Sequence, residues 1–254
     1  MLIAKLYRRI SSIFSACIIL ACVCVILASV LDLSVWLFAA AGFAFCMAVF
    51  LFISVGFAKK MQQYIDLMYR EFDPYPFGEL VKTAWNKKNA VTVLNYSVFL
   101  YEIGQTEESL KAISYFDTKY VKDPFYYVIY NNNLGTYQKK DPEKRNAAVF
   151  ALREATTHLK NPAQQQRAQD LLTSMLLSGA IEDGNLQEAE KWFATERPTL
   201  STPYAKLGEQ LAEARIALLK GNKEAAEPLL REIAGKAPLM RTGKEAAELL
   251  ASLS

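Results

Sequence analysis

The chain has 254 residues, of which 22% are charged, and a formal net charge of +3 at pH 7. Residues 1–59 account for all of this charge, through Lys5, Arg8, Arg9 and Lys59 against Asp32. The remaining sequence is neutral and lacks the excess of basic residues by which proteins bind nucleic acid. We therefore expect no nucleic-acid partner.

The first 58 residues are strongly apolar, and after Arg9 their only charged residue is Asp32. An uncharged helix over residues 10–31, at about 1.5 Å per residue, is about 33 Å long, which is enough to cross a hydrocarbon core. A second apolar run follows a short polar interruption around Asp32. The sequence therefore predicts a transmembrane helical hairpin in residues 1–58, with spans at about 10–31 and 35–57.

Basic residues flank this hairpin on both sides, whereas the turn between the spans has only Asp32. Basic flanks stay on the cytoplasmic side of a membrane, so we expect an integral membrane protein with its N-terminus and its C-terminal domain in the cytoplasm. The sequence ILAC at 19–22 loosely resembles a lipoprotein cleavage box, but a long apolar run follows it, and signal peptides usually have a shorter apolar core. A single crossing in total would instead place the C-terminal domain outside.

All cysteines lie in the apolar part, as Cys17, Cys22, Cys24 and Cys46. Their absence from the rest of the sequence excludes a disulfide framework there and fits a reducing compartment. With no histidine or carboxylate beside the first three, we interpret them as small apolar residues of membrane helices.

Residues 59–78 are interpreted as a juxtamembrane helix and a linker. Apolar residues at helical spacing continue the second span as far as Phe72. The segment DPYPFG, residues 73–78, then contains two prolines and a glycine and is predicted to break the helix.

A short pattern recurs in the C-terminal domain, residues 79–254, as GQTEESLKAI at 104–113, GNLQEAEKWF at 184–193 and GNKEAAEPLL at 221–230. The glycine can end one helix in the left-handed conformation. The next polar residue can cap a second helix, whose first-turn acids favour the positive end of its dipole. The small residue five positions after the glycine lets the two helices approach closely; it is Ser109, Ala189 or Ala226.

These features resemble the tetratricopeptide repeat family. A bulky residue follows each glycine after about nine positions, at Ile113, Phe193 and Leu230, and Pro238 closes the last unit. The resemblance covers residues 89–240, with units at 89–123, 124–160, 162–198 and 203–238, although KKDPEK in the second unit supplies no glycine. Residues 242–253 are expected to form a solvated capping helix. The predicted fold class is all-α: two transmembrane helices followed by an α-solenoid of about four helix-turn-helix repeats.

The sequence offers no catalytic constellation. His158 is the only histidine, and its expected place near a helix C-terminus suits the helix dipole. No phosphate loop, dinucleotide fingerprint or nucleophile elbow is present. We therefore expect no enzyme activity, no catalytic or metal-binding residue, no cofactor and no small-molecule substrate.

The resemblance implies that the first helices of the pairs line a concave groove that holds an extended peptide. The candidate partner-binding residues are Asn95, Asn131, Asn132, Ser174, Ser178 and Arg215, which could equally form a polar solvated surface. The sequence shows no obvious cluster of basic residues there, so a clamp for acidic tails is not expected. We interpret the aromatic residues between 115 and 137 as core between repeats rather than as a partner site.

From these features we expect a membrane-anchored cytosolic scaffold or adaptor that binds a protein or peptide partner through its groove. The alternative is a subunit or accessory of a membrane complex, of transporter type, bound mainly through the hairpin. The small residues of FAAAGFAFCMA, 38–48, would allow close helix contacts in lipid.

Overall fold

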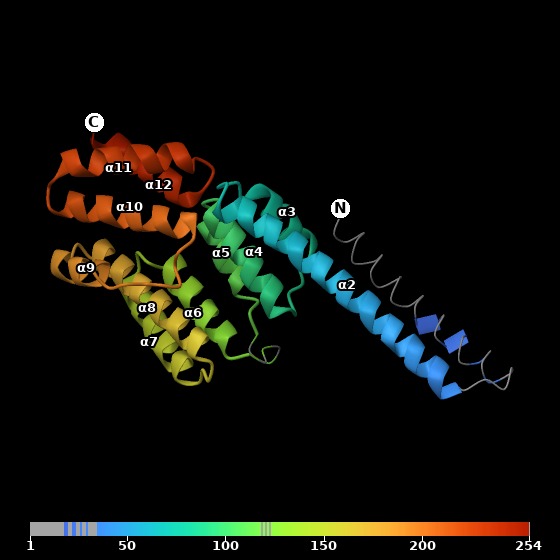
Figure 1. The fold of residues 1–254 in the computed structure, drawn as a ribbon. Coiled ribbons are helices and arrows are strands. Elements are labelled where there is room, and N and C mark those ends of the chain that lie inside the picture. Colours follow the sequence, from blue (N-terminus) through green and yellow to red (C-terminus); the bar gives the residue numbers. More distant parts are fainter. Residues whose placement is uncertain are drawn as a thin grey trace. The chain divides into compact units, whose positions relative to one another are not determined.

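The computed structural model describes residues 18, 19, 22, 23, 26, 29 and 35–253, except 118, 120 and 122. Within that part, the chain forms helices, from α2 to α12, and no strand (Figure 1). This confirms the all-α fold class. The first predicted span, at 10–31, lies mostly outside the described residues.

The chain divides into two compact units, Met1–Asp66 and Leu67–Ser254. Most of α2 (Val35–Tyr69) belongs to the first unit, and the predicted second span continues into the predicted juxtamembrane helix as one helix. Among the described residues, no helix has both the length and the apolar character needed to cross a membrane. The division between the units falls within the segment that the sequence marks as helix and linker.

The break after α2 is shorter than predicted. α3 (Tyr75–Thr83) begins inside the segment DPYPFG, with Pro76 in its first turn. Proline is tolerated at that place because the N–H groups of a first turn have no partner within the helix. The prediction that 73–78 interrupts the helix is therefore right for its first residues and wrong for its last ones.

Four helix pairs follow in the described part of the second unit, and a single helix ends it. They are α4 (Ala90–Glu102) with α5 (Thr106–Ile113), α6 (Phe125–Tyr137) with α7 (Pro142–Thr157), α8 (Pro162–Glu182) with α9 (Leu186–Phe193), α10 (Pro203–Leu219) with α11 (Lys223–Lys236), and finally α12 (Arg241–Leu253). The two helices of each pair pack against each other, and each pair contacts the next. The arrangement is that of a helical repeat protein.

The turns within three of these pairs have the predicted glycine geometry. Gly104, Gly184 and Gly221 have φ angles of 88°, 67° and 76°, a conformation that side-chain-bearing residues rarely adopt. The small residues five positions later, Ser109, Ala189 and Ala226, are each 0% exposed. Close approach of the paired helices therefore depends on these small side chains.

The turns within the pairs differ in the residue that caps the second helix. Asn185 and Asn222 accept hydrogen bonds from backbone N–H groups in the first turns of α9 and α11, as predicted. Gln105 makes no such bond at the start of α5. The turn between α6 and α7 has no glycine and uses Asp141 as a cap, followed by Pro142.

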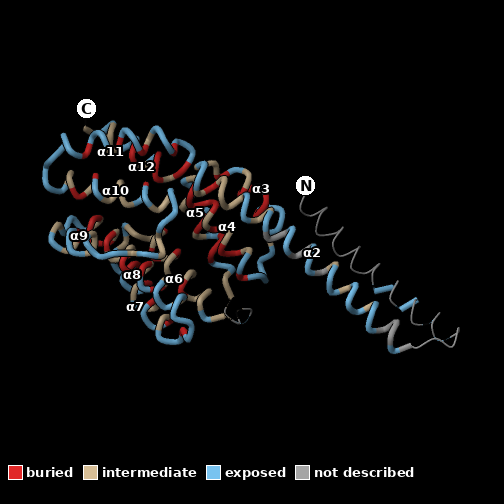
Figure 2. The backbone as a smooth tube through the Cα atoms, in the orientation of Figure 1, coloured by how far each residue is buried: buried red, intermediate tan, exposed pale blue. Residues whose placement is uncertain are grey.

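Buried residues concentrate where the helices of the second unit meet, and exposed residues cover their outer faces (Figure 2). Aromatic rings fill the space between the first two pairs: Tyr101 and Tyr137 have ring centroids 4.5 Å apart, and Phe116 stacks on Tyr130 at 4.5 Å. This supports the interpretation of these aromatic residues as inter-repeat core, except for Tyr115, which is exposed. Tyr120 lies outside the described residues.

The last helix packs against the first pair as well as against its neighbours. α12 contacts α4, α10 and α11, and Lys244 donates to the carbonyl oxygen of Ile103 at 2.8 Å. The guanidinium of Arg241 lies 4.5 Å from the centre of the Tyr101 ring. The row of pairs therefore curves until its two ends meet, and α12 is not merely a solvated cap.

Candidate functional site

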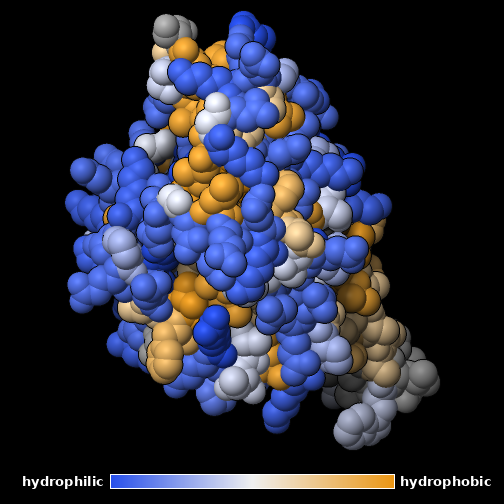
Figure 3. Space-filling model, turned by 90° about the vertical axis from the view of Figure 1, so that its left-hand side faces the viewer, coloured by the Kyte–Doolittle hydropathy of each residue, from blue (hydrophilic) through white to orange (hydrophobic). Residues whose placement is uncertain are grey.

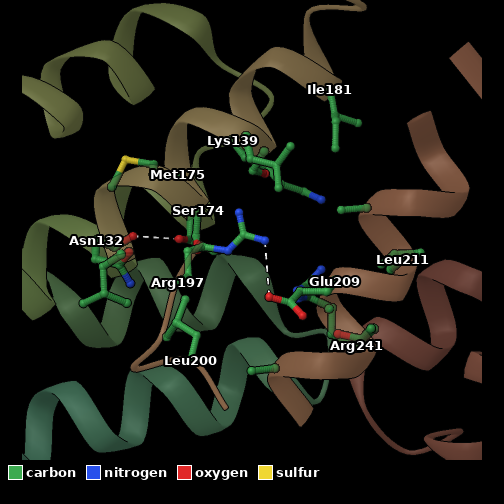
Figure 4. Close-up of a pocket in the computed structure, with 18 of the residues that line it drawn as sticks. Asn132, Lys139, Ser174, Met175, Ile181, Arg197, Leu200, Glu209, Leu211 and Arg241 are labelled. Atoms are coloured by element: carbon green, nitrogen blue, oxygen red, sulfur yellow. Dashed lines mark hydrogen bonds and ion pairs between the residues drawn. The ribbon is translucent and has the colours of Figure 1, made fainter. Parts of the chain in front are cut away.

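A cavity of about 340 Å³ lies on the inner side of this curved row. It is lined by α4, α6, α8, α10 and α12, by Arg145 of α7 and by residues between α9 and α10. Each of three helices contributes a stripe with a residue at every third or fourth position, the spacing of one helix face. The stripes are Asn132, Thr136 and Lys139 on or just after α6; Leu171, Ser174, Ser178 and Ile181 on α8; and Gly208, Leu211 and Arg215 on α10. Figure 4 shows how side chains from these separate helices converge on one space.

Five charged residues form one connected group beside the cavity, which we call the ionic network: Lys139, Glu182, Arg215, Arg241 and Glu245. Glu182 lies 3.0 Å from Lys139 and 2.9 Å from Arg215. Glu245 lies 3.2 Å from each of the same two bases and 2.7 Å from Arg241. Burial would raise the pKa of Glu182, but Arg215 and Lys139 outweigh it and lower the pKa to about 2. Burial likewise opposes ionisation of Glu245, but Lys139, Arg241 and Arg215 lower its pKa. Both carboxylates are therefore ionised at neutral pH.

A second polar group joins α4, α10 and α12 at the edge of the same cavity. The hydroxyl of Tyr204 hydrogen-bonds to the buried carboxyl group of Glu102 and lies 2.8 Å from the hydroxyl of Thr242. Burial raises the pKa of Glu102 above its ordinary value. The pKa of Tyr204 is raised for the same reason, so its hydroxyl keeps its proton.

The connection between α9 and α10, residues 194–202, crosses α8 and closes one side of the cavity; we call it the strap. The carboxylate of Asp170 accepts hydrogen bonds from the backbone N–H of Thr199 at 2.8 Å and from its hydroxyl at 2.6 Å. The guanidinium of Arg167 donates to the carbonyl oxygen of Thr199. Arg197 in the strap reaches Glu209 on α10 at 3.2 Å (Figure 4). Side chains of α8 thus hold the strap by its backbone at a turn, in which the N–H of Leu200 donates to the carbonyl oxygen of Arg197 at 3.0 Å.

The outer surface of the second unit offers less to a partner than this cavity does. Seen from the side of α9, hydrophilic side chains dominate, and apolar ones show between them down the middle and in smaller patches elsewhere (Figure 3). Large exposed apolar side chains come singly from different elements, as Tyr75, Val91, Tyr115, Phe150, Leu219 and Leu239. Isolated apolar residues are ordinary on protein surfaces.

The structure brings four of the sequence-predicted site residues to the cavity: Asn132, Ser174, Ser178 and Arg215. Asn131 is not among its lining residues, and its amide donates to the carbonyl oxygen of Tyr127 in its own helix at 2.8 Å. Asn95 is half-buried in α4 and is likewise not among the lining residues. Ser174 already donates to the carbonyl oxygen of Asp170 at 3.0 Å.

Several lining residues were not anticipated, including Glu102, Arg197, Leu200, Tyr204, Arg241 and Glu245. The strap residues lie outside any helical periodicity, and α12 reaches the cavity only because the row closes. The expectation that the groove lacks a basic cluster was wrong. Lys139, Arg215 and Arg241 gather there from separate parts of the chain, but Glu182 and Glu245 pair with them.

Comparison of the chain with models of protein families, with curated proteins and with solved structures gives no match. In the part that the structure describes, histidine, cysteine and acidic side chains form no group of three suited to a metal ion. The cavity is therefore interpreted from its own geometry.

Proposed function

We propose that this chain is a non-catalytic, membrane-anchored adaptor that holds an extended segment of a partner protein in the cavity of its helical-repeat unit. The proposal rests on one observation: stripes from α6, α8 and α10 face a single space of about 340 Å³. Ligand pockets range from about 300 to 1,000 Å³ and combine apolar walls with a few polar groups. A space at the small end of this range suits a few side chains rather than a folded domain.

The lining has the composition that such binding needs. Leu171, Ile181 and Leu211 supply apolar contact, while Asn132 and Ser178 present polar groups to a peptide backbone. The resemblance to tetratricopeptide repeats, carried by the glycine turns and the buried small residues, gives the same inner faces a role in peptide binding. Fold resemblance alone does not determine function, so the lining residues are the main support.

Membrane anchoring is the second part of the proposal, and its support is the sequence of residues 1–58 with Asp32 as the only charge after Arg9. In α2, the exposed fractions of Trp36 and Phe52 are 86% and 83%, and hydrocarbon would cover such side chains. The flanking basic residues favour a cytoplasmic location for both ends. A cysteine at Asp73 should therefore resist an impermeant thiol reagent on intact cells, and labelling there would contradict this orientation.

The cavity proposal is tested by a photo-crosslinking amino acid at Ser178 of the full chain in native membranes. A matched probe replaces Phe150, which lies on α7 and is 72% exposed. We expect discrete crosslinked partners from Ser178 that are absent from Phe150. Identical products from both positions, or none from Ser178, would contradict a partner site in the cavity.

The alternative is that the partner binds mainly through the hairpin, as in an accessory subunit of a membrane complex. The exposed apolar side chains of α2, such as Phe43 and Phe52, favour it because neighbouring membrane helices could cover them as lipid does. A third crosslinking probe at Phe52 separates the two. Partner products from Phe52 together with none from Ser178 would favour the alternative.

A further inference from the structure

Gly208 leaves an open place in the wall of the cavity. It lies exposed on the inner stripe of α10, and a Cβ atom built on it would meet no atom within 4 Å. Packing requires other glycines: a Cβ at Gly135 would lie 2.6 Å from the sulfur of Met175, and one at Gly243 would lie 2.0 Å from a backbone oxygen. Glycine is unfavourable within a helix, and no neighbouring atom requires position 208 to lack a side chain. The consequence of glycine here is free space in the cavity.

The walls around this space are suited to an uncharged group. Apolar side chains share the cavity with Gly208, namely Leu171, Met175, Leu200 and Leu211. The charged residues of the lining already have polar partners: Arg197 pairs with Glu209, Arg215 pairs with Glu182, and Glu102 accepts from the hydroxyl of Tyr204. A charged occupant would lose its hydration and compete with the existing pairs, whereas an apolar one would gain contact.

The strap shows how a chain segment lies in this place. Asp170 and Arg167 on α8 bind the backbone of Thr199 from both its N–H and its carbonyl side. The next residue, Leu200, lines the cavity. Around Thr199 the strap makes a turn, in which the N–H of Leu200 donates to the carbonyl oxygen of Arg197 at 3.0 Å. The strap therefore shows that side chains of α8 can hold a chain segment by its backbone while an apolar side chain of that segment lines the cavity.

We propose that the space above Gly208 is a subsite for one large uncharged apolar side chain of an extended partner segment, and that Gly208 determines this specificity. The inference rests on the proposed function, because it names the chemistry of the partner. The segment would lie beside the strap, with its apolar side chain between Leu171 and Leu211 and its backbone near Asn132 and Ser178.

The test uses the full chain in nanodiscs and a phage-displayed library of random linear peptides as the probe. The binding of enriched peptides is then compared among the wild type, Gly208→Ala, Gly208→Leu and the control Gly235→Leu. Gly235 is exposed and has open space for a Cβ, as Gly208 has, but it lies on α11 and is not among the lining residues. A Cβ at 208 meets no atom within 4 Å, so folding should be retained, and thermal unfolding of each variant verifies this.

We expect the enriched peptides to share one leucine, methionine or phenylalanine and to bind Gly208→Leu at least about tenfold more weakly, as expected for loss of one buried apolar side chain. Gly208→Ala should have a smaller effect and Gly235→Leu none. Enriched peptides without a shared apolar residue, or with unchanged affinity for Gly208→Leu, would overturn the subsite. The proposed function would survive that result if a crosslinker at Ser178 still captures the peptides.

Two further outcomes also count against the subsite. If the library yields no binder, both the subsite and the peptide-binding function fail. If native mass spectrometry shows a lipid or fatty acid bound to the wild type and lost from Gly208→Leu, the cavity holds an acyl chain and the assignment to a partner segment is wrong.

Discussion

Lys139, just after α6, lies 3.2 Å from the carboxylate of Glu245 in α12, although 106 residues separate the two in sequence. In an open row of repeats, α6 and α12 would not be neighbours. Their contact arises because the row curves until α12 meets α4. The same carboxylate also pairs with Arg215 of α10, so one residue holds three parts of the repeat unit around the cavity.

We expect Glu245→Gln to destabilise the second unit by about 2 kcal/mol. Its carboxylate pairs with three bases while only 20% of the side chain is exposed. Removing one partner of a buried pair costs about 3–5 kcal/mol because the other charge stays behind, and partial exposure reduces this figure. Urea unfolding of the solubilised chain, followed by tryptophan fluorescence, measures the change.

Glu248→Gln is the matched control, since Glu248 is an exposed residue of the same helix. Its effect should be within about 0.5 kcal/mol. Equal losses from the two substitutions would mean that the ionic network does not hold the closed arrangement.

The pH dependence of stability should contain a contribution from Glu182. Burial opposes ionisation, but Arg215 and Lys139 lower its pKa from 4.5 to about 2 in the folded chain. A carboxylate with a depressed folded pKa stabilises the fold fully above the unfolded pKa, and this stabilisation is lost as the pH falls from about 4.5 to about 2. Glu182→Gln should therefore have a lower free energy of unfolding than the wild type at neutral pH. The difference between the two free energies should shrink on acidification, by up to about 1.4 kcal/mol per pH unit.

Urea unfolding at a series of pH values gives this difference directly. Glu102→Gln is an informative comparison because burial raises the pKa of Glu102, so its protonation on acidification favours the folded state. That variant should keep the acid-induced loss that depends on Glu182. A constant difference between the wild type and Glu182→Gln across the range would refute the assignment.

Local features of the repeat unit could be predicted from the sequence because neighbouring residues determine them. A left-handed glycine, a cap after it and a small residue five positions on specify a helix pair wherever they occur. Gly184, Asn185 and Ala189 illustrate all three. The pattern did not predict the turn before α7, because this turn has no glycine and instead has Asp141 as the cap of α7, followed by Pro142.

Long-range features could not be predicted in the same way. The resemblance to tetratricopeptide repeats implied that Ser174, Ser178 and Arg215 face inward, and they line the cavity. The number of pairs and the curvature at each interface decide whether the row closes, and neither follows from one repeat. The contributions of Glu102 and Arg241 depend on that closure, so no local pattern could reveal them.

Gly184→Ala should destabilise the second unit by about 1–2 kcal/mol. Gly184 has a φ of 67°, and a Cβ there would meet no atom within 4 Å. The cost therefore arises from the left-handed backbone conformation alone, which disfavours residues with a Cβ by roughly this amount. Gly184→Asn should cost less, because asparagine tolerates this conformation. Urea unfolding of both variants gives the comparison, and equal losses would show that conformation is not the cause.

Gly78→Ala should destabilise the second unit for a different reason, namely steric overlap of the new Cβ with a neighbouring side chain. A Cβ at Gly78 would lie 2.1 Å from the ring of Phe99, so α3 or the ring would have to move, at a cost of about 1–3 kcal/mol typical of overpacked cores. Gly235→Ala provides the control, because its site in α11 is open and alanine there should stabilise by up to about 1 kcal/mol. Opposite signs for the two glycine-to-alanine changes are expected in urea unfolding. A gain from Gly78→Ala would mean that α3 does not pack against Phe99 in solution.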